Sequence, residues 1–274
     1  MKLLKFSDGN SKLAVGIKTF SMPAGYACPG SDACRSQAVK TNVGFRIKDG
    51  PNCQFRCFAA IDEVLKPNVR EQRWHNFNLL KSCKSTSEMV TLIIASLPSS
   101  PFNLPVRLHV SGDFFSQMYF DAWLEITQKF PKRIFYAYTK SLPFWLARKD
   151  NIPPNFRLVA SRGGKWDSLI EEKGLRSAKV VYSEAEAVTL GLPIDHDDSH
   201  AYEGTGDFAL LLHGTQPAGS EAAKSWQSLK NIGKGGYHNQ KRGRGWGGKD
   251  YAGKPLPKNY AGGTTPSYKG AVVA

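Results

Sequence analysis

The chain has 274 residues, of which 41% are hydrophobic, enough to bury the core of one large α/β domain or two small ones without covalent cross-links. Its five cysteines are far fewer than a disulfide-stabilised scaffold uses, and their odd number leaves at least one unpaired, which favours a reducing compartment. The formal net charge of +14 excludes an acidic protein and suggests a polyanionic partner.

The N-terminal residues MKLLKFSDGNSK contain no apolar run of signal-peptide length, and the most apolar stretch, 88–97, is about half a membrane span. We therefore expect a soluble protein of the cytoplasm, or of the host cytoplasm if its origin is viral, with no membrane partner. A first strand is predicted over 13–22, where LAVGIKTFSM has strand composition. Pro23 ends this strand and begins a loop, 23–57, that holds four cysteines.

Beyond this loop, apolar runs of strand length alternate with segments of helical periodicity. Helices are predicted at about 58–82 and 86–97. Further strands are predicted at 106–112, 133–141, 156–162, 178–184 and 207–214, separated by the helical segments YFDAWLEITQKF, LPFWLARK and WDSLIEEKG. Alternating units leave little room for antiparallel hairpins. The sequence thus predicts an α/β fold with a mainly parallel sheet, either doubly wound or a partial (βα)6 barrel.

The segment from residue 230 to 274 is rich in Gly, Lys and Arg and almost devoid of aliphatic residues until its end. It carries nine Lys or Arg against one Asp, a net charge of +8, which leaves about +6 for the preceding residues. We expect an α/β domain over 1–229 and a disordered basic tail over 230–274. The tail interleaves its charges with Trp246, Tyr251 and Tyr260, a composition that suits single-stranded nucleic acid but also a merely solubilising end.

Polar residues gather where the predicted strands end, which in parallel sheets is where sites form. This set comprises His109, Ser111, Asp113, Lys140, Ser141, Arg162, Lys165, Glu184, His213 and Gln216. Turns and helix caps at strand ends also favour such residues. His109 alternates with Ser111 and Asp113, so the three are expected on one side of the strand, either as a polar cluster or as a core histidine bonded to Asp113.

The segment PIDHDDSHAY at 193–202 places His196 and His200 four residues apart, with three Asp residues beside them. On a helix the two imidazoles would share a face and could bind a divalent metal. Pro193 and the Asp and Ser residues instead favour an acidic surface loop. Both interpretations remain open at this point.

The cysteines of the loop fall in two pairs, CPGSDAC at 28–34 and CQFRC at 53–57. Thiolates are soft ligands, so Cys28, Cys34, Cys53 and Cys57 suit an iron–sulphur cluster or zinc. Neither pair has the spacing of a zinc knuckle, and reduced thiols without a metal remain an alternative. Cys83, in LLKSCKS, is expected to be incidental.

The motifs CPGSDAC, RLHVSGDFFSQMYFDAWLEI, RIFYAYTKSLPFW and RLVASRGG together resemble the phage gene product 88 domain family over roughly residues 10–230. The resemblance implies a viral origin more than a particular reaction. Many members have a second cysteine set after the last strand, whereas LLLHGTQPAGSEAAKSW has none here, so a second cluster is not expected.

The layout also resembles radical S-adenosylmethionine enzymes, which combine a six-unit partial barrel with cluster cysteines after the first strand. The resemblance implies that Cys28, Cys34 and Cys57 hold a [4Fe–4S] cluster and that Ser111, Gly112 and Asp113 form the cofactor turn. The cysteine spacing departs from the usual three-then-two arrangement, and a fourth ligand, Cys53, would leave no iron open to the cofactor.

Two functional hypotheses follow. The first is a phage iron–sulphur enzyme, using S-adenosylmethionine, that acts on a nucleotide, nucleic acid or peptide, with His109, Asp113, Lys140, Arg162, Glu184 and His213 around the reacting groups. The second is a nucleic-acid-binding protein that uses the basic tail, with zinc or no metal. The oligomeric state does not follow from the sequence.

Overall fold

The structure is a computed structural model that describes residues 2–9, 12–99 and 104–231. Its strands are β1 (Ser7–Asp8), β2 (Lys18–Ser21), β3 (Ser36–Thr41), β4 (Gly44–Asp49), β5 (Val106–Ser111), β6 (Phe135–Thr139), β7 (Phe156–Ser161), β8 (Ser177–Val181) and β9 (Phe208–Leu211). Its helices are α1 (Phe58–Leu65), α2 (Pro67–Ser82), α3 (Thr86–Ser96), α4 (Gln117–Lys129), α5 (Leu142–Leu146), α6 (Ser168–Glu172), α7 (Glu184–Thr189), α8 (Ser199–Tyr202) and α9 (Glu221–Asn231), with a 3-10 turn at Lys149–Asn151.

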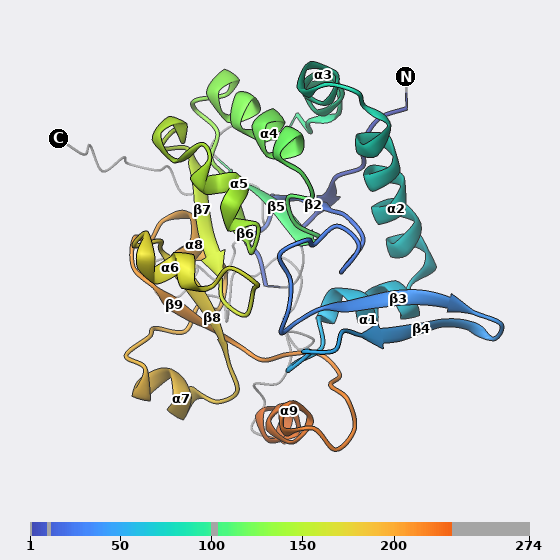
Figure 1. Cartoon of the computed structure of the whole chain (residues 1–274), viewed down its shortest axis with the longest axis vertical. Coiled ribbons are helices and arrows are strands. Elements are labelled where there is room, and N and C mark those ends of the chain that lie inside the picture. The colour runs from blue at the N-terminus through green and yellow to red at the C-terminus, as the bar shows by residue number, and fades with distance from the viewer. Residues whose placement is uncertain (1, 10–11, 100–103, 232–274) are drawn as a thin grey trace, which may run out of the picture.

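The fold is mixed α/β, built on a seven-stranded, mostly parallel sheet in the order β1-β2-β5-β6-β7-β8-β9 (Figure 1). Only the β1–β2 pair is antiparallel, and every other neighbouring pair in this sheet is parallel. Within the described residues the sheet is open, since β1 and β9 form its two edges. The parallel strands thus confirm the predicted α/β class.

Helices α2, α3 and α4 cover one face of the sheet, and this layer holds the largest hydrophobic cluster (Figure 1). In α4, Trp123, Phe120 and Tyr119 are fully buried against the strands, because apolar residues recur there at helical spacing. Burial of each such ring contributes about 2–3 kcal/mol relative to an exposed one. Ser116 caps the helix by accepting a hydrogen bond from the Tyr119 amide.

The opposite face of the sheet is more polar. Arg107, Tyr136 and Val159 point to this side, where they meet α8 and the segment before β2. This face therefore contains charged groups in its interior as well as apolar side chains.

The prediction that hairpins have little room is wrong, because β3 and β4 form an antiparallel hairpin inside the cysteine loop. Ser36 pairs with Asp49 at its base, and the chain reverses at Asn42 and Val43. In Figure 1 the hairpin projects from the body of the protein beside α1.

Other boundaries differ in detail. The helix predicted over 58–82 is two helices, because Pro67 starts α2 and Lys66 is left extended between them. The tail predicted from residue 230 lies outside the described residues, apart from its first two residues in α9. No helix among the described residues is both long enough and apolar enough to cross a bilayer.

Candidate metal centre at the cysteine loop

Cys28, Cys34 and Cys57 lie close enough together for their charges to interact. Cys28 lies in the turn after β2, Cys34 lies in the turn before β3, and Cys57 is the residue that precedes α1. Burial raises the pKa of Cys28 well above its ordinary value, and the neighbouring charges of Asp113 and the two other thiols raise it further. Burial likewise raises the pKa of Cys57 to about 12. Both thiols are therefore protonated at neutral pH, and binding of a cation would release these protons.

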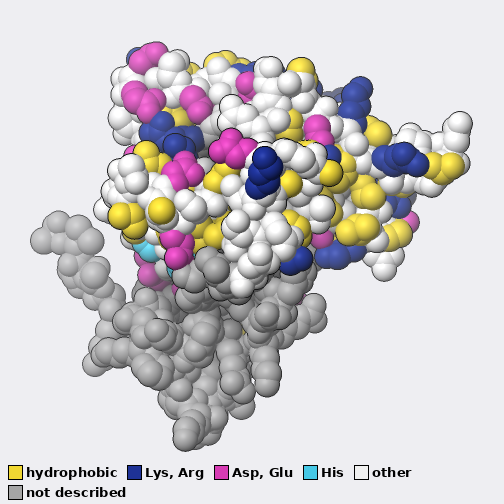
Figure 2. Space-filling view, turned by 90° about the horizontal axis from the view of Figure 1, so that it is seen from below, with side chains coloured by type: hydrophobic (Ala, Val, Ile, Leu, Met, Phe, Trp, Pro, Cys, Tyr) yellow, Lys and Arg dark blue, Asp and Glu magenta, His cyan; other side chains and the backbone are white. Residues whose placement is uncertain are grey.

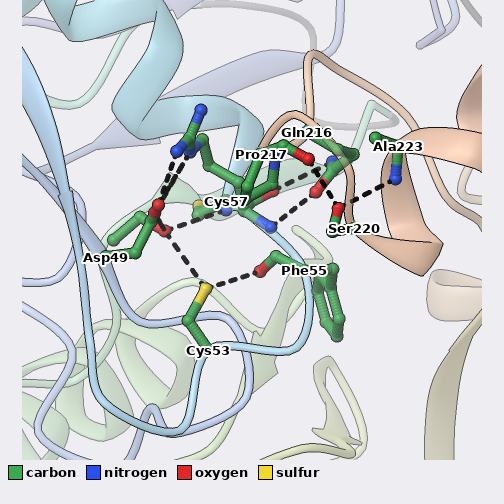
Figure 3. Close-up of polar contacts among 10 residues, drawn as sticks. Asp49, Cys53, Phe55, Cys57, Gln216, Pro217, Ser220 and Ala223 are labelled. Carbon is green, nitrogen blue, oxygen red and sulfur yellow. Dashed lines mark hydrogen bonds and ion pairs between the residues drawn. The ribbon is translucent and has the colours of Figure 1, made fainter.

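Cys53 is held differently from the other three. Its thiol donates a hydrogen bond to the Phe55 carbonyl at 3.3 Å and lies 3.7 Å from the Ser36 hydroxyl (Figure 3). Burial raises its pKa, and the charges of Asp49 and Cys34 raise it further, so Cys53 also lies within electrostatic range of Cys34. Cys83 is remote from the loop, at the end of α2, where its thiol contacts the Leu79 carbonyl.

A network of polar contacts fixes the segment between Cys53 and Cys57. Arg56 forms an ion pair with Asp49 at the end of β4, and Asp49 also accepts a hydrogen bond from Ser36 (Figure 3). Gln216, from the loop after β9, accepts a hydrogen bond from the Arg56 amide at 2.6 Å and donates to the Arg56 carbonyl at 3.3 Å. The loop after the last strand therefore holds the cysteine segment in place.

The turn after β5 braces the same loop. Gly112 adopts φ +86°, and a Cβ there would lie 2.9 Å from the Met22 Cβ, so only glycine fits. The Asp113 amide donates to the Ala27 carbonyl, next to Cys28, at 2.9 Å. Burial raises the pKa of Asp113 to about 6.

Both carboxylate oxygens of Asp113 are occupied by protein donors. They accept hydrogen bonds from the Phe114 amide at 2.7 Å, the Thr139 hydroxyl at 2.7 Å and the Lys140 amide at 2.8 Å. Asp113 thus ties the end of β5 to the end of β6. Ser111 faces elsewhere, toward Glu63 of α1, with its hydroxyl 3.5 Å from Oε1.

The expectation that His109 shares a side with Ser111 and Asp113 is wrong. Between the pairs Thr19–Arg107 and Ser21–Ser111, β2 advances two residues and β5 advances four, so β5 contains a bulge. His109 lies in this bulge at φ +60°. Its ring is therefore turned toward α4, where Nε2 is 3.1 Å from the Tyr119 hydroxyl and the ring meets Phe114 edge-on.

His109 gives the protein a testable pH dependence, because burial lowers its pKa from 6.5 to about 3. An unfolded chain takes up this proton as pH falls below 6.5 while the folded chain does not, so stability present above pH 6.5 is lost toward pH 3. We expect the variant His109→Asn to lack this pH dependence, which amounts to about 1.4 kcal/mol in the free energy of unfolding per pH unit. Asparagine suits the position because it tolerates positive φ. Urea unfolding of the wild type and the variant from pH 6.5 to 4 measures this effect. A difference in the free energy of unfolding between the two proteins that does not change with pH would contradict it.

Lys140 and Arg162 bind neighbouring strand ends. The Lys140 ammonium donates to the Ser161 carbonyl and hydroxyl at 2.9 and 2.7 Å and to the Arg162 carbonyl. The Arg162 guanidinium donates to Ser177 at 3.0 Å and pairs with Glu171. Lys140 also lies near the cysteine loop, because a Cβ on Gly30 would collide with its carbonyl.

His213 lies near the cysteine loop and Glu184 lies apart from it. The His213 ring packs on Phe58, the residue after Cys57, with ring centres 4.7 Å apart, and burial lowers its pKa to about 4. Glu184 is the first residue of α7, beyond the carboxyl end of β8, where its charge acts on His196. The structure therefore brings Asp113, Lys140 and His213 to the cysteine loop but not His109 or Glu184.

The acidic segment after α7 is neither exposed throughout nor helical throughout. Asp198 is fully buried and pairs with Lys12 and with Arg107, each at 2.6 Å. It also accepts hydrogen bonds from Tyr136 and Tyr138. Asp195, likewise buried, accepts a hydrogen bond from Tyr138, and its Oδ1 lies 3.6 Å from His200. The prediction of an acidic surface loop is wrong for these two carboxylates.

Thiolates suit a soft metal ion or an iron–sulphur cluster at the cysteine loop. As they stand, however, the thiols do not form a complete coordination shell. In residues 2–9, 12–99 and 104–231, no three His, Cys, Asp or Glu side chains are gathered tightly enough to hold a metal ion as they stand. This also leaves the His196–His200 pair without a metal-binding group around it. The convergence of Cys28, Cys34 and Cys57, each partly buried, nevertheless supplies three soft donors within one loop.

A pocket of about 610 Å³ adjoins this loop. One wall consists of Asp32, Ala33, Gln54 and Phe55, which are sequence neighbours of Cys34 and Cys53. The other walls are the loop after β7, strand β8, the segment after α7 and the start of β9. Sequence reasoning anticipated Arg162 in this region.

Comparison with known proteins shows the family to which the chain belongs. The family model described as Gene product 88 matches residues 2–229, nearly all of the described chain. The chain belongs to the gene product 88 family. It is similar to the Gene 88 proteins of Mycobacterium phages D29 and L5, with 30% and 31% identity over 112 residues. These alignments cover 38% of this chain and 47% of each relative, so the chain spans about half the length of the curated relatives it matches. No solved structure matches.

Membership of the gene product 88 family confirms the expected phage affiliation. Two residues that hold the cysteine loop were not predicted from the sequence. Glu63 holds it from α1, and Arg56, the partner of Gln216, holds it from within the loop. The only signal for Glu63 was its place as one of two acidic residues in the mainly apolar helix FAAIDEVL, and Arg56 had no signal beyond its place between two cysteines.

Proposed function

We propose that this gene product 88 protein is an iron–sulphur enzyme of the radical S-adenosylmethionine type, with Cys28, Cys34 and Cys57 as cluster ligands. The observation that carries the proposal is the convergence of these thiols at the loop after β2. Cys53 is turned to the Phe55 carbonyl and would leave one iron without a protein ligand. A [4Fe–4S] cluster with such an iron supplies an electron to the sulphonium cofactor.

The order of the sheet supports a partial (βα)6 barrel. Six parallel strands, β2 and β5 to β9, follow one another in both chain order and sheet order, as in a singly wound barrel. The cysteine loop, Asp113, Lys140 and His213 all follow the carboxyl ends of these strands, where barrel sites form.

Glu63, rather than Asp113, is the carboxylate suited to the cofactor's amino group. Asp113 already accepts three hydrogen bonds, whereas the Oε2 atom of Glu63 is buried and has no hydrogen-bond partner within the described residues. Its other oxygen is held by the Ala24 amide and by Arg73, each at 2.8 Å. A buried acceptor without a donor is costly, and a bound ammonium would satisfy it.

The pocket beside the loop supports the proposal, because it offers room for a small substrate. Its volume of about 610 Å³ falls within the range of roughly 300–1,000 Å³ of small-molecule sites. A nucleotide, one nucleotide of a nucleic acid, or a peptide side chain would fit beside Cys34 there. The chain's own groups would orient this substrate, and the partial burial of Cys28 and Cys57 would limit the access of water to the reacting centre.

Anaerobic purification followed by iron and sulphide analysis tests the proposal. We expect a brown protein with a broad visible absorbance that dithionite bleaches, and with about four irons per chain after reconstitution. Equimolar zinc without sulphide, or a colourless protein with neither iron nor sulphide, would contradict it.

A further inference from the structure

The β3–β4 hairpin has two different faces. Ser36 and Ala38 are 1% and 3% exposed and point toward α1. On the other face, Arg46 lies opposite Val39 and Lys48 lies opposite Gln37. Both basic side chains are exposed, so one face anchors the hairpin and the other is left to solvent.

The exposed side of the hairpin carries uncompensated positive charge. Arg46 and Lys48, which lie on this side, form no ion pair with any residue that the structure describes. The one acidic residue of the hairpin, Asp49, is already paired with Arg56. Figure 2 shows Lys and Arg side chains along the projection at the right, which is the hairpin.

The shape of the hairpin favours a duplex over a single strand. Its six-residue strands extend roughly 20 Å, and a two-stranded ribbon fits the major groove of B-DNA, which is about 12 Å wide. Single strands are held mainly by stacking on exposed aromatic rings. The one ring of the hairpin, Phe45, is instead covered by Arg70, whose guanidinium lies 3.7 Å from the ring centre.

We propose that the β3–β4 hairpin is a docking surface for duplex DNA, with Arg46 and Lys48 contacting phosphates. The proposed contacts are independent of base sequence, because phosphates are the same at every position of the duplex. Duplex RNA is excluded as the preferred partner, since its major groove is too deep and narrow for a ribbon. This surface does not require a cluster to be present.

Fluorescence anisotropy with the full chain and a labelled DNA duplex tests the surface. We expect the double variant Arg46→Gln, Lys48→Gln to bind at least about 10-fold more weakly at 0.1 M salt, and the salt dependence of log K to become shallower by about 1.8. The matched control is Lys132→Gln, Lys173→Gln, which changes the net charge equally at exposed positions before β6 and β8. It should bind nearly as tightly as the wild type.

Both variants alter exposed side chains that form no ion pair within the described residues, so thermal unfolding should be unchanged in each. An equal loss in the control, or no loss in the hairpin variant, would overturn the proposal. So would binding to duplex RNA or to single-stranded DNA of the same length that is as tight as binding to duplex DNA.

Discussion

Replacing Cys57 with serine is expected to abolish retention of the cluster while leaving the fold intact. Cys57 occupies the position before α1, with extended backbone angles, and serine is favoured at such a position because its hydroxyl can accept a helix amide. Loss of the thiolate removes one of three ligands, and an oxygen ligand is a poor substitute toward iron. Cys28→Ser and Cys34→Ser should give the same loss of iron and sulphide.

The measurement is iron and sulphide content after identical anaerobic reconstitution, with circular dichroism to confirm folding. Cys53→Ser and Cys83→Ser are the matched controls, since the Cys53 thiol is bonded to the Phe55 carbonyl and Cys83 lies at the end of α2. Both should retain the wild-type iron content. Loss of iron from Cys53→Ser, with retention in Cys34→Ser, would show that the ligand set is wrong.

Asp198→Asn is expected to cause a large loss of stability for so conservative a change. The carboxylate is fully buried and is the shared partner of Lys12 and Arg107. Asparagine keeps the size of the side chain and tolerates φ +69°, but it leaves two buried cations without their counter-charge. Breaking a buried pair in this way costs about 3–5 kcal/mol.

Urea unfolding at pH 7 measures this loss, and the neighbouring change Asp197→Asn is the control. Asp197 is partly exposed and accepts a single hydrogen bond, from the Ser199 amide at 3.0 Å. Its replacement should cost about 1 kcal/mol or less. Equal effects of the two variants would mean that the buried pairing with Lys12 and Arg107 contributes little.

Local composition was sufficient to predict most strands of the sheet from the sequence. The strands predicted at 106–112 and 156–162 are β5 and β7 within one residue at each end, because β-branched and aromatic residues in these runs also become the buried positions. The hairpin was not predicted, although polar and apolar residues alternate on both sides of TNVG, a pattern that is typical of two strands joined by a tight turn. Its strands carry more polar than apolar residues, so they lack the strong signal of a buried strand.

The environment of individual site residues was less predictable. His109 was placed by regular alternation, which the bulge in β5 interrupts. The buried state of Asp198 depends on Arg107 and Tyr136, which are distant in sequence and reach it only when the sheet forms. The roles of Asp113 and Gln216 as braces likewise depend on donors from other strand ends.

The position of the β3–β4 hairpin between Cys34 and Cys53 means that the spacing of cysteines in the sequence is a poor guide to their spacing in space. The two strands run side by side and are paired at the base, from Ser36 to Asp49, so the chain leaves and returns at nearly the same place. Residues added to or removed from the tip in matched pairs would leave the base unchanged. Homologues with much longer or shorter insertions at this point could therefore keep the same thiol arrangement, and a search for fixed cysteine intervals would fail to group them.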